Sequence, residues 1–303
     1  MNLAAEGRAR GSKSTRASVD HLGRLIVTSR PGYRPGQVIS LEMVSGEAGV
    51  SRAMAREVLQ VLHQKRLVGL QPRVGATVRP VEQWDVFDPD VIEWRLHVAP
   101  RFQMRSLTEV RQAIEPMAAF LAAERASADV CRDLVSLSQQ MQDLGRDETF
   151  THDNPEGRDC RERYRAADVE FHSALLKGSQ NEMLYALADP VAKALNYRID
   201  QWVGARGLGS GPGGNKPFPI SPSPLALWLH RGLAAAVEQG HPPAAETFSR
   251  AILVEVRTDP FPPLIGIALE NALPLLDPRA MGAETGEFEE EIRAAVRDAK
   301  AGS

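Results

Sequence analysis

The chain has 303 residues, of which 43% are hydrophobic and 25% are charged, with a formal net charge of −3. This length predicts about two domains. No run of 18 apolar residues occurs, and the first 24 residues lack the apolar stretch of a secretory signal, so we expect neither a membrane-spanning nor a secreted protein. The two cysteines, Cys131 and Cys160, lie outside any metal-motif spacing, and we expect reduced thiols in a cytoplasmic protein.

Charge is distributed unevenly along the chain. Residues 1–80 contain 13 Lys and Arg against 5 Asp and Glu, a net charge of +8, whereas residues 81–303 contain 23 against 34, a net charge of −11. A basic module of this charge density attracts nucleic acid by counterion release, and an acidic module is repelled by it. We therefore expect nucleic acid to contact only the first part of the chain.

The basic part predicts a winged helix-turn-helix in residues 18–80, preceded by a disordered polar arm in residues 1–17. Ser51 is an N-cap signal, and the helix after it carries an apolar stripe with arginines on another face. Gly75 allows a tight turn between two short strands. The predicted elements are helices at Ala17–Arg30, Ser40–Ala48 and from Ser51 onward, and strands at Leu67–Leu70 and Ala76–Arg79.

The acidic part predicts helices almost throughout, so the fold class is mainly α, with an all-helical antiparallel bundle after the N-terminal domain. A connector at residues 81–102, with a short helix at Val91–Arg95, leads to the bundle at residues 103–257. Residues 205–224 are rich in Gly, Pro and Ser and predict a loop, and residues 258–303 form a C-terminal extension without an assigned role. The long helix at Gln103–Ala126 is expected to bury the apolar stripe Val110, Ile114, Met117 and Leu121. Further helices are expected at roughly 129–145, 160–177, 182–203, 225–239 and 243–257.

Motifs in both parts resemble the GntR superfamily of bacterial transcription regulators, and in particular its FadR-type branch with a C-terminal helical FCD domain. The first set is Pro35-Gly36, Val50-Ser51-Arg52, Arg56-Glu57-Val58-Leu59, Leu67-Val68 and Arg73-Val74-Gly75-Ala76-Thr77-Val78. The second set is Glu109-Val110-Arg111, Ile114-Glu115-Pro116, Ala122-Ala123-Glu124-Arg125, Asp168-Val169-Glu170-Phe171-His172, Ser179-Gln180-Asn181, His230 and Ala236-Val237. Trp84, Asp88–Trp94 and Glu109–Arg111 also resemble the galactonate-operon repressor group, whose members respond to sugar acids. The resemblance implies a ligand-responsive transcription regulator, a repressor of sugar-acid catabolism that a small carboxylate releases from DNA.

The start of the third predicted helix and the wing supply the candidate DNA contacts. A recognition helix presents its first turns to base edges, where the arginine fork fits guanine O6 and N7. The six candidates are Ser51, Arg52, Ala53, Arg56, Arg73 and Gly75. The alternative for the arginines is a solvated helix face or turn. Relatives usually carry a Glu-Arg pair in the second helix, but this chain has Leu41-Glu42-Met43, so no DNA-contacting arginine can be transferred there.

Three residues of the acidic part are candidate metal ligands. Asp168 and His172 are four residues apart, a spacing that projects both side chains from one helix face, where they can share a metal ion. The resemblance supplies His230, on a later helix, as the third ligand. This set suits Zn²⁺, Mn²⁺ or Ni²⁺. Metal-binding relatives carry a further histidine where this chain has Ile252, so a metal-free pocket that hydrogen-bonds the effector directly stays open as an alternative.

Three other residues are candidates for effector binding. Arg111 lies beside the expected core stripe of the long helix and is a natural clamp for a carboxylate, because the guanidinium pairs with it through two hydrogen bonds. The alternative is an internal salt bridge with Glu109 or Glu115. Arg198 and Trp202 precede the predicted loop and could close the pocket and stack on a sugar, although a tryptophan there more often serves in packing.

The expected partners are double-stranded operator DNA, a small carboxylate effector of the sugar-acid type and a second copy of the chain. Paired operator half-sites require a two-fold symmetric protein, so we expect a homodimer formed through the helical domain. The rival function is a metal-dependent hydrolase or isomerase built on Asp168, His172 and His230, because three ligands plus water is also a catalytic design. That rival leaves the basic winged domain without a role, so an enzyme is not expected.

Overall fold

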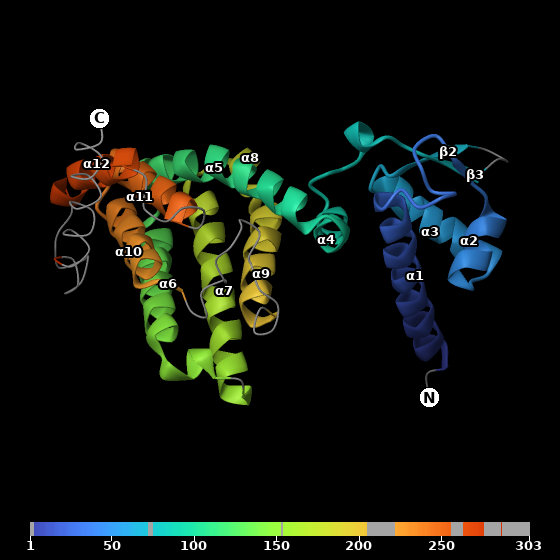
Figure 1. The fold of residues 1–303 in the computed structure, drawn as a ribbon, viewed down its shortest axis with the longest axis horizontal. Coiled ribbons are helices and arrows are strands. Elements are labelled where there is room, and N and C mark those ends of the chain that lie inside the picture. The colour runs from blue at the N-terminus through green and yellow to red at the C-terminus, as the bar shows by residue number, and fades with distance from the viewer. Residues whose placement is uncertain are drawn as a thin grey trace. The chain divides into compact units, whose positions relative to one another are not determined.

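The computed structural model describes the backbone of residues 3–71, 75–152, 154–204, 222–255, 263–275 and 286. It describes the side chains of residues 15–71, 75–152, 154–197, 222–253 and 268–275. The chain folds into two compact units, residues 1–104 and 105–303 (Figure 1).

The N-terminal unit is a winged helix-turn-helix, as the sequence predicts. Its elements are α1 (Leu3–Val27), β1 (Val38–Ile39), α2 (Leu41–Ala48), α3 (Arg52–Gln64), β2 (Val68–Gln71), β3 (Gly75–Val78), the 3₁₀ turn η1 (Val81–Gln83) and α4 (Pro89–Val98). The three strands form an antiparallel sheet in the order β1-β3-β2, with Val38 opposite Thr77 and Val68 opposite Val78. The hairpin β2–β3 is the predicted wing, whereas the two-residue strand β1 was not predicted.

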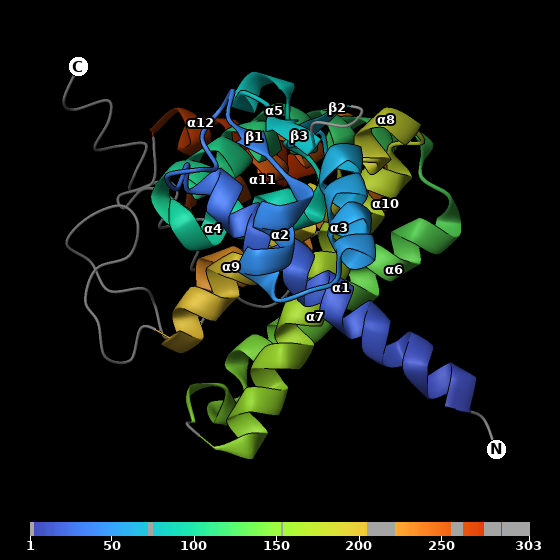
Figure 2. The same cartoon turned by 90° about the vertical axis from the view of Figure 1, so that its right-hand side faces the viewer.

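Helix caps define the turn between α2 and α3, which lie side by side (Figures 1 and 2). The Ser40 hydroxyl accepts a hydrogen bond from the backbone amide of Met43, and the Ser51 hydroxyl accepts one from that of Met54, each at 3.2 Å. Gly49 ends α2 with a φ of +66°, a conformation that favours glycine. The buried face of α3 consists of Ala55, Val58, Leu59 and Leu62. The caps and this stripe together fix which face of α3 points outward.

Helix α1 begins earlier than the sequence analysis predicts. It runs from Leu3, whereas residues 1–17 were expected to be a disordered arm. Ala, Glu, Arg and Lys in this stretch are good helix formers, and they extend a helix whose second half is already fixed by packing. The buried side chains of that half are Val19, Leu22, Leu25 and Ile26.

The segment expected to be a connector, residues 81–102, lies within the N-terminal unit and contains α4, which packs on α1. Trp94 of α4 is buried, and its ring lies so close to Gly23 of α1 that a Cβ at residue 23 would come within 2.4 Å of it. The Trp94 Nε1 donates a hydrogen bond to Asp20 at 3.3 Å. Lys65, which follows α3, pairs with Asp88 at 2.9 Å and with Asp90 at 2.7 Å. These contacts attach α4 to both α1 and the end of α3.

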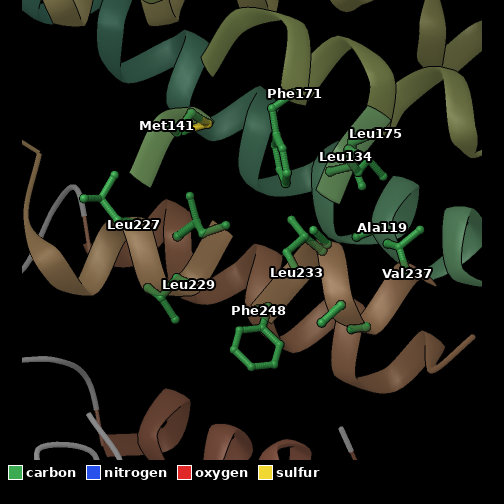
Figure 3. Close-up of a cluster of buried hydrophobic side chains, with 14 of the residues drawn as sticks. Ala119, Leu134, Met141, Phe171, Leu175, Leu227, Leu229, Leu233, Val237 and Phe248 are labelled. Carbon is green, nitrogen blue, oxygen red and sulfur yellow. The ribbon is translucent and has the colours of Figure 1, made fainter. Parts of the chain in front are cut away.

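The C-terminal unit is the predicted all-helical antiparallel bundle. Its elements are α5 (Pro100–Arg125), which starts before the unit boundary, α6 (Ala128–Arg146), η2 (Glu148–Thr151), α7 (Pro155–Gly178), α8 (Glu182–Tyr185), α9 (Ala188–Gly204), α10 (Pro224–Glu238), α11 (Pro242–Glu255), α12 (Pro263–Ala272) and η3 (Leu273–Leu275). Helix α6 packs on α7 and α10, α7 packs on α9, and α10 packs on α11. Phe171, Leu233 and Phe248 lie in the hydrophobic core of this unit (Figure 3).

Helix α5 does not bury the stripe that the sequence analysis predicts. Val110, Ile114 and Leu121 are only half-buried, and Met117 is 51% exposed. The buried face carries Leu107, Arg111, Glu115, Ala118, Ala119 and Ala122. Alanines allow close approach of α7, since the Ala122 Cβ would lie only 3.2 Å from a Cβ added at Gly178. Small side chains therefore determine the packed face, and two charged side chains are buried with them.

Much of the predicted loop and C-terminal extension lies outside the described residues. Residues 205–221 of the loop and 258–262, 276–285 and 287–303 of the extension are not described. The described part of the extension forms α12 and η3. Ser223, near the end of the predicted loop, caps α10 by accepting a hydrogen bond from Ala226 at 3.0 Å.

Candidate functional sites

Three polar side chains converge inside the C-terminal unit. Asp168 and His172 come from α7 and His230 from α10, and all three are at most 2% exposed. The Nε2 atoms of His172 and His230 are 3.4 Å apart, and the Asp168 Oδ1 lies 3.7 Å from the first and 3.6 Å from the second. The structure thus brings together the three predicted metal ligands as one nearly equilateral triangle of donor atoms.

The opposite nitrogen of each imidazole faces an acceptor. The His230 Nδ1 lies 2.7 Å from the backbone carbonyl of Ala226, and the His172 Nδ1 lies 2.9 Å from the Glu115 Oε2. With its proton on Nδ1, each ring would present the lone pair of Nε2 to the triangle. The Nε2 of His172 also faces the Arg111 Nη2, at 3.4 Å. Histidine ligands of metal sites are oriented by partners of this kind.

The triangle has the dimensions of a divalent metal site. A point equidistant from the three donor atoms in their plane lies about 2.1 Å from each, within the range of zinc bonds to nitrogen and carboxylate oxygen. Three lone pairs that converge in a buried site also favour a cation between them. The residues therefore fit a metal ion. Ile252, at the position of the relatives' further histidine, is 3% exposed and belongs to the hydrophobic core, so it offers no donor.

Arg111 and Glu115 of α5 form a buried ion pair beside this triangle. The Arg111 Nε donates to the Glu115 Oε1 at 2.5 Å, and the Arg111 Nη2 donates to the Oε2 at 3.3 Å. The same Nη2 lies 3.4 Å from the His172 Nε2. Of the two alternatives for Arg111, the internal salt bridge is present, and its partner is Glu115. The effector-clamp role of Arg111 stays a prediction, and the guanidinium has five N–H donors, more than the ion pair uses.

The shifted pKa values of Arg111 and Glu115 both favour the charged form of the side chain. Burial alone would raise the pKa of Glu115, but Arg111 and His172 outweigh it and hold that pKa well below the ordinary value. Burial alone would lower the pKa of Arg111, but Glu115 and Asp168 outweigh it and raise that pKa. The sequence indicates Glu115 only as one of two possible partners of Arg111, and its contact with His172 is not predicted from the sequence. The spacing of 111 and 115 was a signal for the pair, but nothing in the sequence linked it to His172.

The two remaining effector candidates, Arg198 and Trp202, stay predictions. Arg198 and Trp202 lie on α9, but their side chains fall outside the described residues.

The candidate DNA contacts on α3 lie on one exposed surface. Ser51, Arg52, Ala53 and Arg56 are all exposed, and the Arg52 side chain is 73% exposed. Arg52 forms an ion pair with Glu42 of α2, a contact that sequence analysis did not predict. Arg73 lies outside the described residues. Gly75 has a φ of +123°, a conformation that favours glycine. A Cβ there would come within 2.4 Å of the Ile39 carbonyl oxygen, so glycine also allows β1 to lie close to β3.

Comparison with known proteins decides the family. The FCD domain family matches residues 106–255. This range contains the triangle of Asp168, His172 and His230 and the buried ion pair of Arg111 and Glu115. Over 187 residues the chain is 30% identical to the galactonate operon transcriptional repressor of Escherichia coli (strain K12), a match that spans 60% of this chain and 75% of that protein. The chain belongs to the GntR family of transcription regulators with an FCD domain.

Two further matches accompany this assignment. The chain is 30% identical over 158 residues to the uncharacterized HTH-type transcriptional regulator YieP of Escherichia coli (strain K12), spanning 52% of this chain and 64% of that protein. The solved structure of Streptococcus agalactiae GntR matches 80% of this chain and 98% of its own, with 19% identity and a TM-score of 0.40.

The family assignment decides between the two functions that the sequence left open. This FCD regulator is a transcription regulator and not an enzyme, so the hydrolase or isomerase alternative for the triangle is set aside. Regulators of this family bind operator DNA and small effectors. Among the described residues, no helix has the length and apolar character needed to cross a membrane.

Proposed function

We propose that this FCD regulator is a homodimeric repressor that a small carboxylate, a sugar acid such as galactonate or gluconate, releases from its operator. The observation that carries the proposal is the buried triangle of Asp168, His172 and His230 beside Arg111, in a domain separate from the DNA-binding one. The likeness to the galactonate operon transcriptional repressor supports the repressor role and the class of effector.

Charge balance at the buried site favours a metal-supported carboxylate. Two acidic side chains, Glu115 and Asp168, are buried there with one guanidinium group, that of Arg111. An additional positive charge beside these carboxyl groups would favour the binding of an acid. Asp168, His172 and His230 would hold a divalent Zn²⁺, Mn²⁺ or Ni²⁺ ion, which when bound supplies the positive charge that attracts a carboxylate oxygen. Arg111, whose Nη2 lies 3.4 Å from the His172 Nε2, would then donate hydrogen bonds to the acid.

The DNA contacts proposed for this repressor are those of the recognition helix α3 and the wing. Exposed Arg52 and Arg56 lie on the first two turns of α3, and Ser51 fixes the start of that helix. Arginine at such positions reads guanine through two hydrogen bonds. We expect Arg56→Ala to weaken operator binding by about 1–3 kcal/mol while leaving effector binding unchanged. Gel-shift titrations at one salt concentration measure the first quantity, and calorimetry with the acid measures the second.

The homodimer is proposed because helix-turn-helix repressors bind two operator half-sites, and these half-sites match a protein with two-fold symmetry. Met117 on α5 and Met183 on α8 are 51% and 74% exposed, and methionine is enriched among the side chains that protein interfaces cover. Sedimentation of the free protein and of its DNA complex tests this, and a monomer in both would contradict the dimer.

The test of the effector proposal compares three forms of the protein. Wild-type protein loaded with one metal, wild-type protein stripped by chelator, and His230→Gln are each screened by thermal shift against galactonate, gluconate and acetate. A ligand that binds the native state raises its stability. We expect a sugar acid to stabilise only the metal-loaded wild type. Equal stabilisation of all three forms would instead indicate a metal-free pocket, and no stabilisation of any form would remove the sugar-acid proposal.

A further inference from the structure

An acidic side chain lies on the surface proposed to meet DNA. Glu42 is in the first turn of α2, its side chain is 61% exposed, and it forms an ion pair with the Nη2 of Arg52, the first residue of α3. The two N-termini of α2 and α3 are thus joined by a pair of opposite charges. In a helix-turn-helix the helix before the recognition helix crosses the DNA backbone, so Glu42 would stand close to phosphates.

An exposed glutamate at such a place carries an electrostatic cost for DNA binding, because phosphates repel it. The other acid of α2, Glu47, is paired differently, with His21 at 3.1 Å and with Arg30 at 3.6 Å. Glu42 is therefore the α2 acid that bears directly on the recognition helix. In the free protein an exposed ion pair of this kind contributes little stability. Its effect is expected in the complex, where DNA displaces water from around it.

We propose that Glu42 is a positioning residue that sets the sequence preference of this repressor by holding the guanidinium of Arg52. This inference rests on the proposed role of α3 in operator recognition. Without an ion-pair partner, an arginine side chain at this position can change its rotamer and bind any nearby phosphate. A phosphate contact carries no sequence information. Glu42 engages one nitrogen of the guanidinium, and the remaining donors stay available for the two acceptors of guanine. The same pairing neutralises Arg52 toward phosphates and so weakens binding to unrelated sequences.

The proposal predicts a higher affinity for unrelated DNA together with a lower discrimination between operator and unrelated DNA. Removing the charge of Glu42 frees Arg52 for phosphate, so affinity for unrelated DNA rises. The dependence of that affinity on salt steepens by about one phosphate contact. Discrimination between operator and unrelated DNA falls by about 5- to 10-fold, a part of what one two-bond guanine contact provides.

The experiment uses the full-length protein and an operator defined by enrichment from a random duplex library with the wild type. Affinities for this duplex and for a scrambled duplex of equal composition are measured by fluorescence anisotropy over a salt series. The variants are Glu42→Gln, the matched control Glu47→Gln, Arg52→Ala, and Glu42→Gln combined with Arg52→Ala, and circular dichroism checks that each is folded. We expect Glu42→Gln to raise scrambled-DNA affinity and to lower discrimination, with no change for Glu47→Gln. In the Arg52→Ala background the Glu42→Gln change should no longer affect discrimination.

Each other outcome overturns the inference in a recognisable way. Equal gains on both duplexes would make Glu42 a repulsive charge alone, and equal losses would make it a structural residue of the turn. If Arg52→Ala itself leaves both affinities unchanged, the recognition-helix assignment in the proposed function fails. If Arg52→Ala lowers operator affinity but Glu42→Gln changes nothing, only the inference about Glu42 fails.

Discussion

Replacing Glu115 by glutamine should destabilise the helical unit strongly, because it breaks a buried ion pair from one side. Glu115 is fully buried, Arg111 is 6% exposed, and the two share hydrogen bonds of 2.5 and 3.3 Å. Removing one partner of a buried pair leaves the other charge uncompensated, at a cost of about 3–5 kcal/mol. Asp168 still acts on Arg111 in the variant, so we expect a loss near the lower end, about 3 kcal/mol.

The matched control is Glu109→Gln on the same helix. Glu109 pairs with Arg105 at the same spacing of four residues and at 3.2 Å, but the two side chains are 57% and 73% exposed. A surface pair of this type contributes about 0.3–0.5 kcal/mol. Chemical denaturation at pH 7, followed by circular dichroism, compares both variants with the wild type. Losses of similar size at the two positions would contradict this prediction, because the difference in burial would then have no energetic consequence.

Two further predictions concern the N-terminal unit. Gly23→Ala should lower the stability of this unit by about 1–3 kcal/mol, because the added Cβ would overlap the Trp94 ring. Gly46→Ala is the control, since a Cβ there meets no atom within 4 Å, and it should be neutral or stabilising. Thermal unfolding of both variants measures the difference in stability. Asp90→Asn should cost about 1 kcal/mol at pH 7, measured by denaturation. Burial raises the pKa of Asp90, but Lys65 and Arg16 together outweigh it, so this pKa lies below its ordinary value. The ionised Asp90 therefore stabilises the fold above about pH 4, and the difference in stability between wild type and variant should close as the pH falls further.

Local signals predicted the DNA-binding unit well. The N-cap Ser51 and the apolar stripe of α3 specify the helix, its start and its buried face within one short segment. The strand β1 escaped prediction because two residues carry no periodicity, and its place depends on the approach of Ile39 to Gly75. The packing of α4 on α1 was equally hidden, since the contact of Trp94 with Gly23 is made between residues far apart in the chain.

The helical unit was predicted in its elements but not in the faces they bury. The spacing of Asp168 and His172 sufficed to place both in one site, because helical periodicity determines it. On α5 the larger apolar residues suggested the wrong face. Alanines there allow a closer helix contact than the larger residues do, and that contact buries Arg111 and Glu115. Burial of a charged pair depends on what neighbouring helices supply, which no single segment of sequence contains.

The most direct test of the account measures operator affinity of the metal-loaded wild type with and without a sugar acid, beside His230→Gln. Coupling between separate sites typically changes affinity about 5- to 150-fold. We expect galactonate or a related acid to weaken operator binding of the wild type within this range. We expect His230→Gln to bind the operator normally but not to respond to the acid. Unchanged wild-type affinity with every sugar acid, or loss of operator binding by folded His230→Gln without any acid, would contradict the central claim that the buried site controls DNA release.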